Sequence, residues 1–421
     1  MKSVSSLESA RRRLSGRSMA ERAVAPVSHT PLSTAEVAQL RSVTPGADNV
    51  IHLNHAGASL PTQATLDAQI HHLQHEAMTG GYEAANDAAE RSEAVYSSLG
   101  SLIGAKHTEL ARLEHATAAW NAGFWSVPMK AGQRIITANA AYGANAVGFL
   151  RAVERRGVII DVVGDDEHGQ VDVAELANRV DDDVALIALT HVPTNGGLVN
   201  PAAAVGTVAN AAGVPYLLDA CQSVGQLHID VDEIGCDLLS GTGRKYLRGP
   251  RGTGFLYASE RIIDRLIPDH PDHHGADWTT PSKYVLQPTA QRFESWEFSH
   301  AGWLGLGNAV DEAVEIGTRR IEATVYERAD SLRAQLQAAG FTVWDLGSRP
   351  CGIVTATGPD LDPSEAKAAL RAQGVNISVT TPASTRFDSA NRNLPDLMRI
   401  SVHYITTEAE IRQAVNTLAS L

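Results

Sequence analysis

The centre of the chain reads Leu218-Asp219-Ala220-Cys221-Gln222-Ser223-Val224-Gly225 and continues, after a short gap, with Leu239-Ser240-Gly241-Thr242-Gly243-Arg244-Lys245. Each stretch begins with the end of an apolar run that is typical of a buried strand, and polar residues follow it. Ligands of open α/β sheets bind at the carboxyl ends of the strands. We therefore expect Asp219 and Lys245 to lie at one binding site, beside a glycine-rich turn.

The apolar runs around this centre predict an α/β fold. They alternate with helical patterns at residues 173–180 and 202–212. Such alternation favours a mostly parallel sheet that is covered by helices on both faces. The predicted buried strands span residues 134–137, 158–163, 184–189, 216–219, 238–240 and 254–257.

The length of 421 residues predicts more than one domain, because a single hydrophobic core rarely grows this large. A helical pattern runs from residue 61 to about 102, and a long helix is predicted over residues 304–337. We expect a disordered tail at residues 1–46, an N-terminal segment packing near the active site at 47–70, a large domain at 71–302 and a small α+β domain at 303–421.

The composition narrows the possible partners. The net charge is -13, which disfavours broad binding to nucleic acids or anionic membranes but allows a local cationic pocket. The chain contains no apolar run of about eighteen residues, so no membrane span is predicted. Its first thirty residues contain arginines but no apolar segment typical of a secretory signal. The three widely spaced cysteines argue against a disulfide framework and favour a cytoplasmic location.

Two common binding motifs are absent. A phosphate-binding P-loop requires Ser or Thr after its lysine, whereas Tyr246 follows Lys245, and the chain also lacks the glycine fingerprint of a dinucleotide-binding fold. His71 and His75 are one helical turn apart, but no HExxH motif is present. We therefore expect neither a nucleotide site nor a bound metal.

The central stretch, together with Gly249-Pro250-Arg251-Gly252-Thr253-Gly254, resembles the core of the class V aminotransferase family. This family has the pyridoxal-phosphate (PLP) fold type I and includes cysteine desulfurases, C–S lyases and epimerase-like enzymes. The resemblance extends from about residue 51 to the C-terminus. It implies a large domain with a mostly parallel sheet, a smaller α+β domain, and a homodimer with its active sites at the subunit interface.

The resemblance assigns roles to the three polar residues of the centre. Lys245 would bind PLP as a Schiff base and then act as the general base on the substrate's α-proton. Asp219 would keep the pyridine nitrogen protonated, which makes the cofactor a better electron sink. Gln222 matches the family position that hydrogen-bonds the phenolic oxygen of the cofactor.

Further positions match residues that surround the cofactor in the family. Thr117 and the amide of Ala118 open a predicted helix and would bind the phosphate, because helix N-termini attract anions. Thr242 and Arg244 are the other phosphate candidates, and Arg244 stands where cysteine desulfurases have a histidine. Tyr142 matches the residue that stacks on the cofactor ring.

The substrate is expected to be an amino acid. Arg399 matches the family's carboxylate-binding arginine. Thr194, with Asn195 as its rival, matches a polar position near the cofactor oxygen and the substrate amine. The remaining substrate candidates are Asn54, His55, Tyr82 and His274, which lie in variable segments expected near the pocket.

One departure from the family pattern bears on the reaction. Cysteine desulfurases have a nucleophilic cysteine on the loop before the carboxylate-binding arginine, but residues 380–388 contain none. Cys221 is expected to pack, and Cys351 precedes a strand. A persulfide mechanism is therefore disfavoured, and β-elimination from a cysteine S-conjugate is the favoured reaction. An epimerase or an aminotransferase is the alternative, and a non-catalytic PLP-fold protein is disfavoured by the complete set of site residues.

Overall fold

The computed structural model describes residues 30–421. Its centre is a seven-stranded sheet in the order β2-β8-β7-β6-β5-β3-β4, in which β3 to β7 run parallel and β8 is antiparallel to both of its neighbours. The strands are β2 (Leu110–Leu113), β3 (Arg134–Ala138), β4 (Ile159–Val163), β5 (Val184–Thr190), β6 (Tyr216–Asp219), β7 (Leu238–Thr242) and β8 (Gly254–Ala258). The six predicted strands and the mostly parallel α/β fold are thus confirmed, and β2 is the strand of this central sheet that was not predicted.

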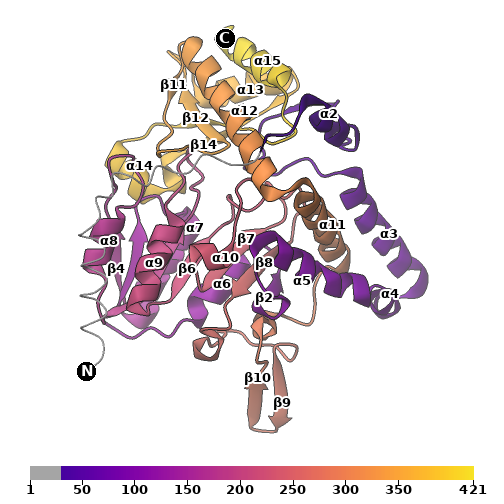
Figure 1. Cartoon of the computed structure of the whole chain (residues 1–421), viewed down its shortest axis with the longest axis vertical. Helices are drawn as coiled ribbons and strands as arrows, with labels where there is room; N and C mark the ends of the chain where they lie inside the picture. The colour runs from indigo at the N-terminus through magenta and orange to yellow at the C-terminus, as the bar shows by residue number, and fades with distance from the viewer. Residues whose placement is uncertain (1–29) are drawn as a thin grey trace.

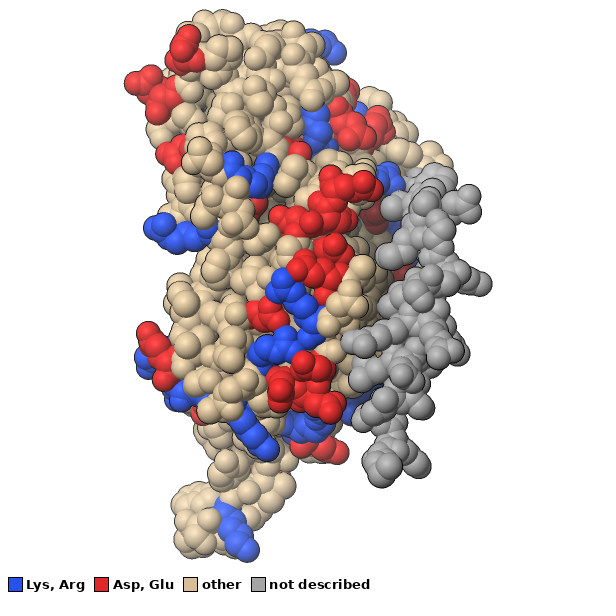
Figure 2. Space-filling view, turned by 90° about the vertical axis from the view of Figure 1, so that its left-hand side faces the viewer, with Lys and Arg blue, Asp and Glu red and all other residues tan. Residues whose placement is uncertain are grey.

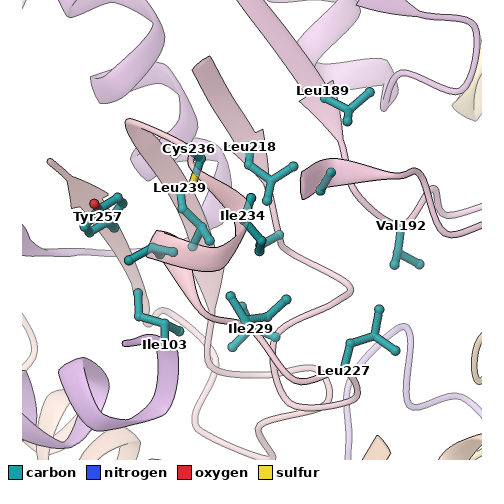
Figure 3. Packing of buried hydrophobic residues seen from close by; sticks show 14 of the residues in the cluster. Ile103, Leu189, Val192, Leu218, Leu227, Ile229, Ile234, Cys236, Leu239 and Tyr257 are labelled. Atoms are coloured by element: carbon teal, nitrogen blue, oxygen red, sulfur yellow. The ribbon is translucent and has the colours of Figure 1, made fainter. Parts of the chain in front are cut away.

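Helices cover the sheet on both faces (Figure 1), which explains why the central strands are apolar throughout. All seven residues of β5 are buried. Figure 3 shows part of the core, where Leu189, Leu218 and Leu239 from adjacent strands pack with Ile234 and Cys236. The covering helices include α6 (Ala116–Ser126), α7 (Gly143–Arg156), α8 (Val173–Arg179), α9 (Ala202–Ala212) and α10 (Val231–Ile234).

A second sheet of four antiparallel strands lies in the C-terminal part of the chain, in the order β11-β12-β15-β14. Residues near the start of the described chain join this part, since β1 (Ile51–His52) pairs with β13 (Val375–Asn376) and Asn54 bridges to Ser401. The elements are β11 (Thr342–Val343), β12 (Ile353–Thr357), α13 (Pro363–Ala372), β14 (Ser378–Thr380), α14 (Arg386–Arg392), β15 (Leu397–Ser401) and α15 (Glu408–Ala419).

Two segments that were each predicted as one continuous helical stretch form several helices in the structure. Residues 304–337 belong to α11 (His300–Ile316) and α12 (Thr318–Ala338), separated by Gly317 at a φ of 91°. Residues with a side chain rarely adopt this backbone conformation, so the glycine permits the break between the two helices. The helical pattern from 61 to 102 likewise forms three helices, α3 (Gln63–Thr79), α4 (Gly81–Asp87) and α5 (Ala89–Ile103).

The prediction of a disordered tail up to residue 46 is wrong for residues 30–46. Helix α2 (Thr34–Ser42) begins with a capping box between Ser33 and Glu36. Arg41 attaches it to the C-terminal part through Glu410, at 2.9 Å, and through the carbonyl of Ile405, at 3.0 Å. These contacts come from residues far along the chain, which the local composition does not reveal. Residues 1–29 lie outside the described part of the chain.

The surface has two further features. A hairpin of β9 (Ala276–Thr280) and β10 (Lys283–Leu286) projects from the body at the bottom of Figure 1, and Trp278 on it is 77% exposed. On the face in Figure 2, acidic and basic side chains are interspersed. Among residues 30–421, no helix is long and apolar enough to cross a membrane.

Candidate active site

A cavity of about 300 Å³ lies at the carboxyl ends of the central strands. The parallel strands bring Thr190, Asp219 and Thr242 to this edge of the sheet, because each is the last residue of its strand. The predicted site residues that line the cavity are Thr117, Tyr142, Thr194, Asp219, Gln222, Thr242, Arg244 and Lys245.

Asp219 is buried at the end of β6 and is held by two donors. Asn145, on the first turn of α7, donates to Oδ2 at 2.7 Å, and the backbone N–H of Cys221 donates to Oδ1 at 3.0 Å. Burial raises the pKa of Asp219, while these hydrogen bonds and the charge of Lys245 oppose the rise. The carboxylate is therefore ready to bind a buried cationic group. Asn145 was missed by the sequence analysis, because its partner lies 74 residues away.

Lys245 is 8% exposed and faces the same cavity. The turn after it is closed by the N–H of Arg248, which donates to the carbonyl of Lys245 at 2.9 Å. Gly225, at a φ of 89°, packs against the backbone of Tyr246, where any Cβ would be within 2.5 Å of a carbonyl carbon. The glycine thus lets the turn that follows Asp219 approach the reactive lysine.

Cys221 was expected to pack, but it lines the cavity. Burial raises the pKa of its thiol, although the nearby Lys245 opposes the rise. A thiol with a raised pKa stays protonated at neutral pH and is a weak nucleophile. Cys221 therefore acts as a neutral neighbour of the lysine.

One end of the cavity is formed by the N-terminus of α6. Thr117 lies there, but Ala118 does not line the cavity, and its amide donates to Nδ1 of the N-cap residue His115 at 3.0 Å. The turn that includes Arg251 touches this helix end at Gly254, where a Cβ would be 2.7 Å from the Cα of His115. The helix N-terminus and a guanidinium make this end suitable for a phosphate.

Arg399, on β15, does not line the cavity itself but contacts Thr194, which does. Its Nη1 donates to Oγ1 of Thr194 at 2.6 Å, and its Nη2 donates to Oδ1 of Asn54 at 3.5 Å. Asn195, the rival of Thr194, is engaged elsewhere, since its Nδ2 donates to Thr385 at 2.5 Å and its Oδ1 accepts from Thr380. Thr194 is the one of the two that borders the cavity and contacts the arginine.

None of the five predicted substrate residues lines this cavity. Arg399 reaches its edge through Thr194, and Asn54 contacts Arg399, whereas the other three are engaged or exposed elsewhere. His55 is 1% exposed, with its ring stacked on that of His403 at 4.6 Å and its Nδ1 bonded to Ser59, so the prediction of a substrate contact is corrected by burial. Tyr82 is exposed on α4, and His274 is paired with the buried Glu294 at 3.2 Å. Neither Tyr82 nor His274 lines the cavity.

The residues of the cavity fit PLP. A buried carboxylate, a lysine and a helix N-terminus match the ring nitrogen, the aldehyde and the phosphate of the cofactor. Gln222 adds an independent sign, because its buried Oε1 has no hydrogen-bond partner among residues 30–421 while its Nε2 donates to the carbonyl of Ala56. A buried polar atom without a partner is rare and indicates a missing ligand or water.

The family model of the class V aminotransferases matches residues 51–414. The chain belongs to this family. PLP is accordingly its cofactor, and the expected PLP fold type I is confirmed. Among the residues that the structure describes, no group of three or more His, Cys, Asp and Glu side chains could hold a metal ion.

Relatives of this class V aminotransferase chain include two kinds of sulfur enzyme. A probable cysteine desulfurase of Methanothermobacter thermautotrophicus is 28% identical over 81% of this chain and 86% of the relative. A probable hercynylcysteine sulfoxide lyase of Mycobacterium tuberculosis is 28% identical over 86% and 87%.

Solved structures have the same fold. The apo cysteine desulfurase from Thermococcus onnurineus has a TM-score of 0.84 at 20% identity, covering 93% of this chain and 99% of that one. A cystine C–S lyase in complex with its product cysteine persulfide has a TM-score of 0.81 at 20% identity, covering 90% and 99%.

Proposed function

We propose that the protein catalyses β-elimination from a cysteine S-conjugate or a related amino acid. The observation that favours this reaction is a cavity with a lysine, bordered by Thr194 in contact with Arg399, next to a loop without a nucleophilic thiol. That loop forms a short 3₁₀ turn (Pro382–Ser384) and the start of α14. The similarity to a probable sulfoxide lyase points in the same direction.

The other two cysteines offer no substitute for the absent nucleophile. Cys236 and Cys351 are both fully buried, and neither lines the cavity. Burial raises the pKa of Cys351 to about 12 and also raises that of Cys236. Because the thiolate is the reactive form, both side chains are inert at neutral pH. Sulfur would then leave with the substrate's own β-substituent.

The residues of the chain divide the work as follows. Arg399 would bind the α-carboxylate, which orients the α-proton toward Lys245. Lys245 would remove that proton after releasing the cofactor's aldehyde carbon to the substrate. Asp219 would hold the proton on the ring nitrogen. When bound, PLP supplies an electron sink for the negative charge at the α-carbon. The burial of Lys245 and Asp219 limits the access of water.

Epimerisation and transamination begin with the same proton removal and use the same residues. They differ in the fate of the charge at the α-carbon, since only elimination expels a group from the β-carbon. The products therefore distinguish the reactions. Elimination yields pyruvate and ammonia, transamination yields an oxo acid without ammonia, and epimerisation yields the other enantiomer.

We also propose a cytoplasmic homodimer. Helix α3, at the right of Figure 1, exposes Leu66, Ile70 and Leu73 at helical spacing on one face. Exposed apolar patches of this kind mark protein interfaces. Tyr82 is exposed on the next helix, α4, and remains a candidate for the cavity of a second copy. Sedimentation equilibrium tests this proposal, and a monomer at micromolar concentration would contradict it.

The central experiment measures products. Purified protein with PLP is incubated with S-substituted L-cysteines and their sulfoxides, and pyruvate, ammonia, oxo acids and D-amino acids are quantified. We expect equal amounts of pyruvate and ammonia. Lys245→Ala should abolish both, whereas Lys130→Ala, at an exposed position, should not change them. Formation of an oxo acid or a D-amino acid without ammonia would contradict elimination.

A further inference from the structure

Two guanidinium groups are attached to one turn beside the cavity. Arg399 donates to the side chain of Asn54, and Arg244 donates to the carbonyl oxygen of Gly57. The N–H of Gly57 closes this turn by donating to the carbonyl of Asn54 at 2.9 Å. Arg399, from β15, and Arg244, from the segment after β7, therefore both bind the turn between Asn54 and Gly57.

The electrostatic surroundings agree with this position of Arg244. The charges of Arg244 and Arg399 both act on Tyr142 and lower its pKa, although burial, the largest influence, raises it overall. Arg244 also lowers the pKa of Arg399 by repulsion, beyond the larger effect of burial. The two cations thus lie close enough to repel each other.

Neither arginine has a carboxylate partner in the part of the chain that the structure describes. Within residues 30–421, no ion pair of Arg244 or Arg399 with Asp or Glu is present, and the buried Nε of Arg399 has no hydrogen-bond partner. Two half-buried cations without an anion are unfavourable, so acidic groups on a ligand would be attracted to both.

The phosphate of PLP does not account for this pair. Arg244 was one of the predicted phosphate residues, but the N-terminus of α6, where Thr117 lies, has a cation of its own in Arg251. The α-carboxylate of an amino acid carries one negative charge and suits Arg399, which is already oriented by Thr194. Arg244 is then available to bind a second acidic group of the substrate.

We propose that Arg244 binds an acidic group on the part of the substrate that leaves from the β-carbon. The substrate class is thereby narrowed to amino acids with a second carboxylate or a comparable anion on the sulfur substituent. This inference rests on the proposed elimination for the identity of the leaving part, but the binding preference itself is independent of turnover.

A matched pair of ligands tests the preference. S-carboxymethyl-L-cysteine and S-carbamoylmethyl-L-cysteine have nearly the same shape and differ in one negative charge. Their dissociation constants are measured from the change in the visible absorption of the holoenzyme, and pyruvate release is measured separately. We expect the acid to bind at least about tenfold more tightly than the amide, as removal of one charged hydrogen bond costs at least that factor.

Three variants identify the residue responsible. Arg244→Gln should reduce the preference to about twofold or less, mainly by weakening the acid, and Arg244→Lys should restore part of it. Arg251→Gln should weaken PLP retention in dialysis and keep the preference for the acid. Equal binding of both ligands to the wild type would overturn the inference. So would an Arg244→Gln variant that weakens both ligands equally, or one that loses PLP as readily as Arg251→Gln.

The binding measurement separates this inference from the proposed function. If the acid binds preferentially but neither ligand releases pyruvate, the elimination is wrong and the anion site stands. If both ligands release pyruvate at equal rates and bind equally, the elimination stands and the anion site is wrong.

Discussion

Replacement of Asn145 offers a direct test of the proposed ring-nitrogen site. The amide of Asn145 donates to Oδ2 of Asp219 at 2.7 Å inside the protein, and this bond lowers the pKa of a carboxyl group that burial raises. A hydrogen bond to a charged group contributes about 1.5–3 kcal/mol. Since about 1.4 kcal/mol corresponds to one pKa unit, Asn145→Ala should raise the pKa of Asp219 by about one to two units.

The sign of the effect on cofactor binding follows from the charge. Asp219 must be ionised to pair with a protonated ring nitrogen, so PLP affinity falls when the carboxyl group becomes protonated at low pH. A plot of PLP affinity against pH therefore falls on its acidic side, and in Asn145→Ala this acidic limb should move to higher pH by about one to two units. The assay is a titration of apoprotein with PLP between pH 4.5 and 8.5, followed by visible absorption.

A matched control is available in the same region of the chain. Asn139 donates to Asp165 at 3.1 Å, but on the surface, and Asn139→Ala should leave the acidic limb unchanged. An unshifted limb in Asn145→Ala, with thermal unfolding showing an intact fold, would refute the assigned role of Asp219. A uniform loss of PLP affinity at every pH would point to a collapsed cavity instead.

Three further predictions concern the substrate, the neighbouring thiol and the fold. Arg399→Gln should raise KM for the amino acid by about tenfold to a hundredfold, because one charged hydrogen-bond donor is lost, while PLP titration stays unchanged; a loss confined to kcat would speak against carboxylate binding. Cys221→Ala should keep pyruvate release within about tenfold of the wild type, since a neutral thiol beside Lys245 contributes at most one hydrogen bond, and complete inactivity would favour a thiol mechanism. Gly317→Ala should destabilise the fold by about 1–2 kcal/mol in urea unfolding, because the φ of 91° is strained for alanine; an unchanged midpoint would show that the break between α11 and α12 can relax.

The fold and the central pair of site residues were predictable from local patterns. Buried strands of a parallel sheet are apolar runs, and the first polar residue after such a run lies at the edge where ligands bind. Asp219 and Lys245 are recognisable for this reason, together with the glycine-rich turn. The break at Gly317 was visible as a glycine but not as a helix end, because single glycines also occur within helices.

Contacts between distant segments were decided only by the tertiary structure. In the sequence, Asn145 looks like any polar residue of a helix, and only the fold places it against Asp219. In the same way, only the fold stacks the ring of His403 on that of His55. The same holds for Arg244 and Arg399, which meet at the turn between Asn54 and Gly57 although β15 lies far from the central stretch. Amino-acid patterns determine which side chains follow which strand, since that depends on neighbours in the chain. Burial, unpaired charges and the proximity of two arginines depend on distances in space. These distances are set only when the two sheets and the N-terminal segment pack together.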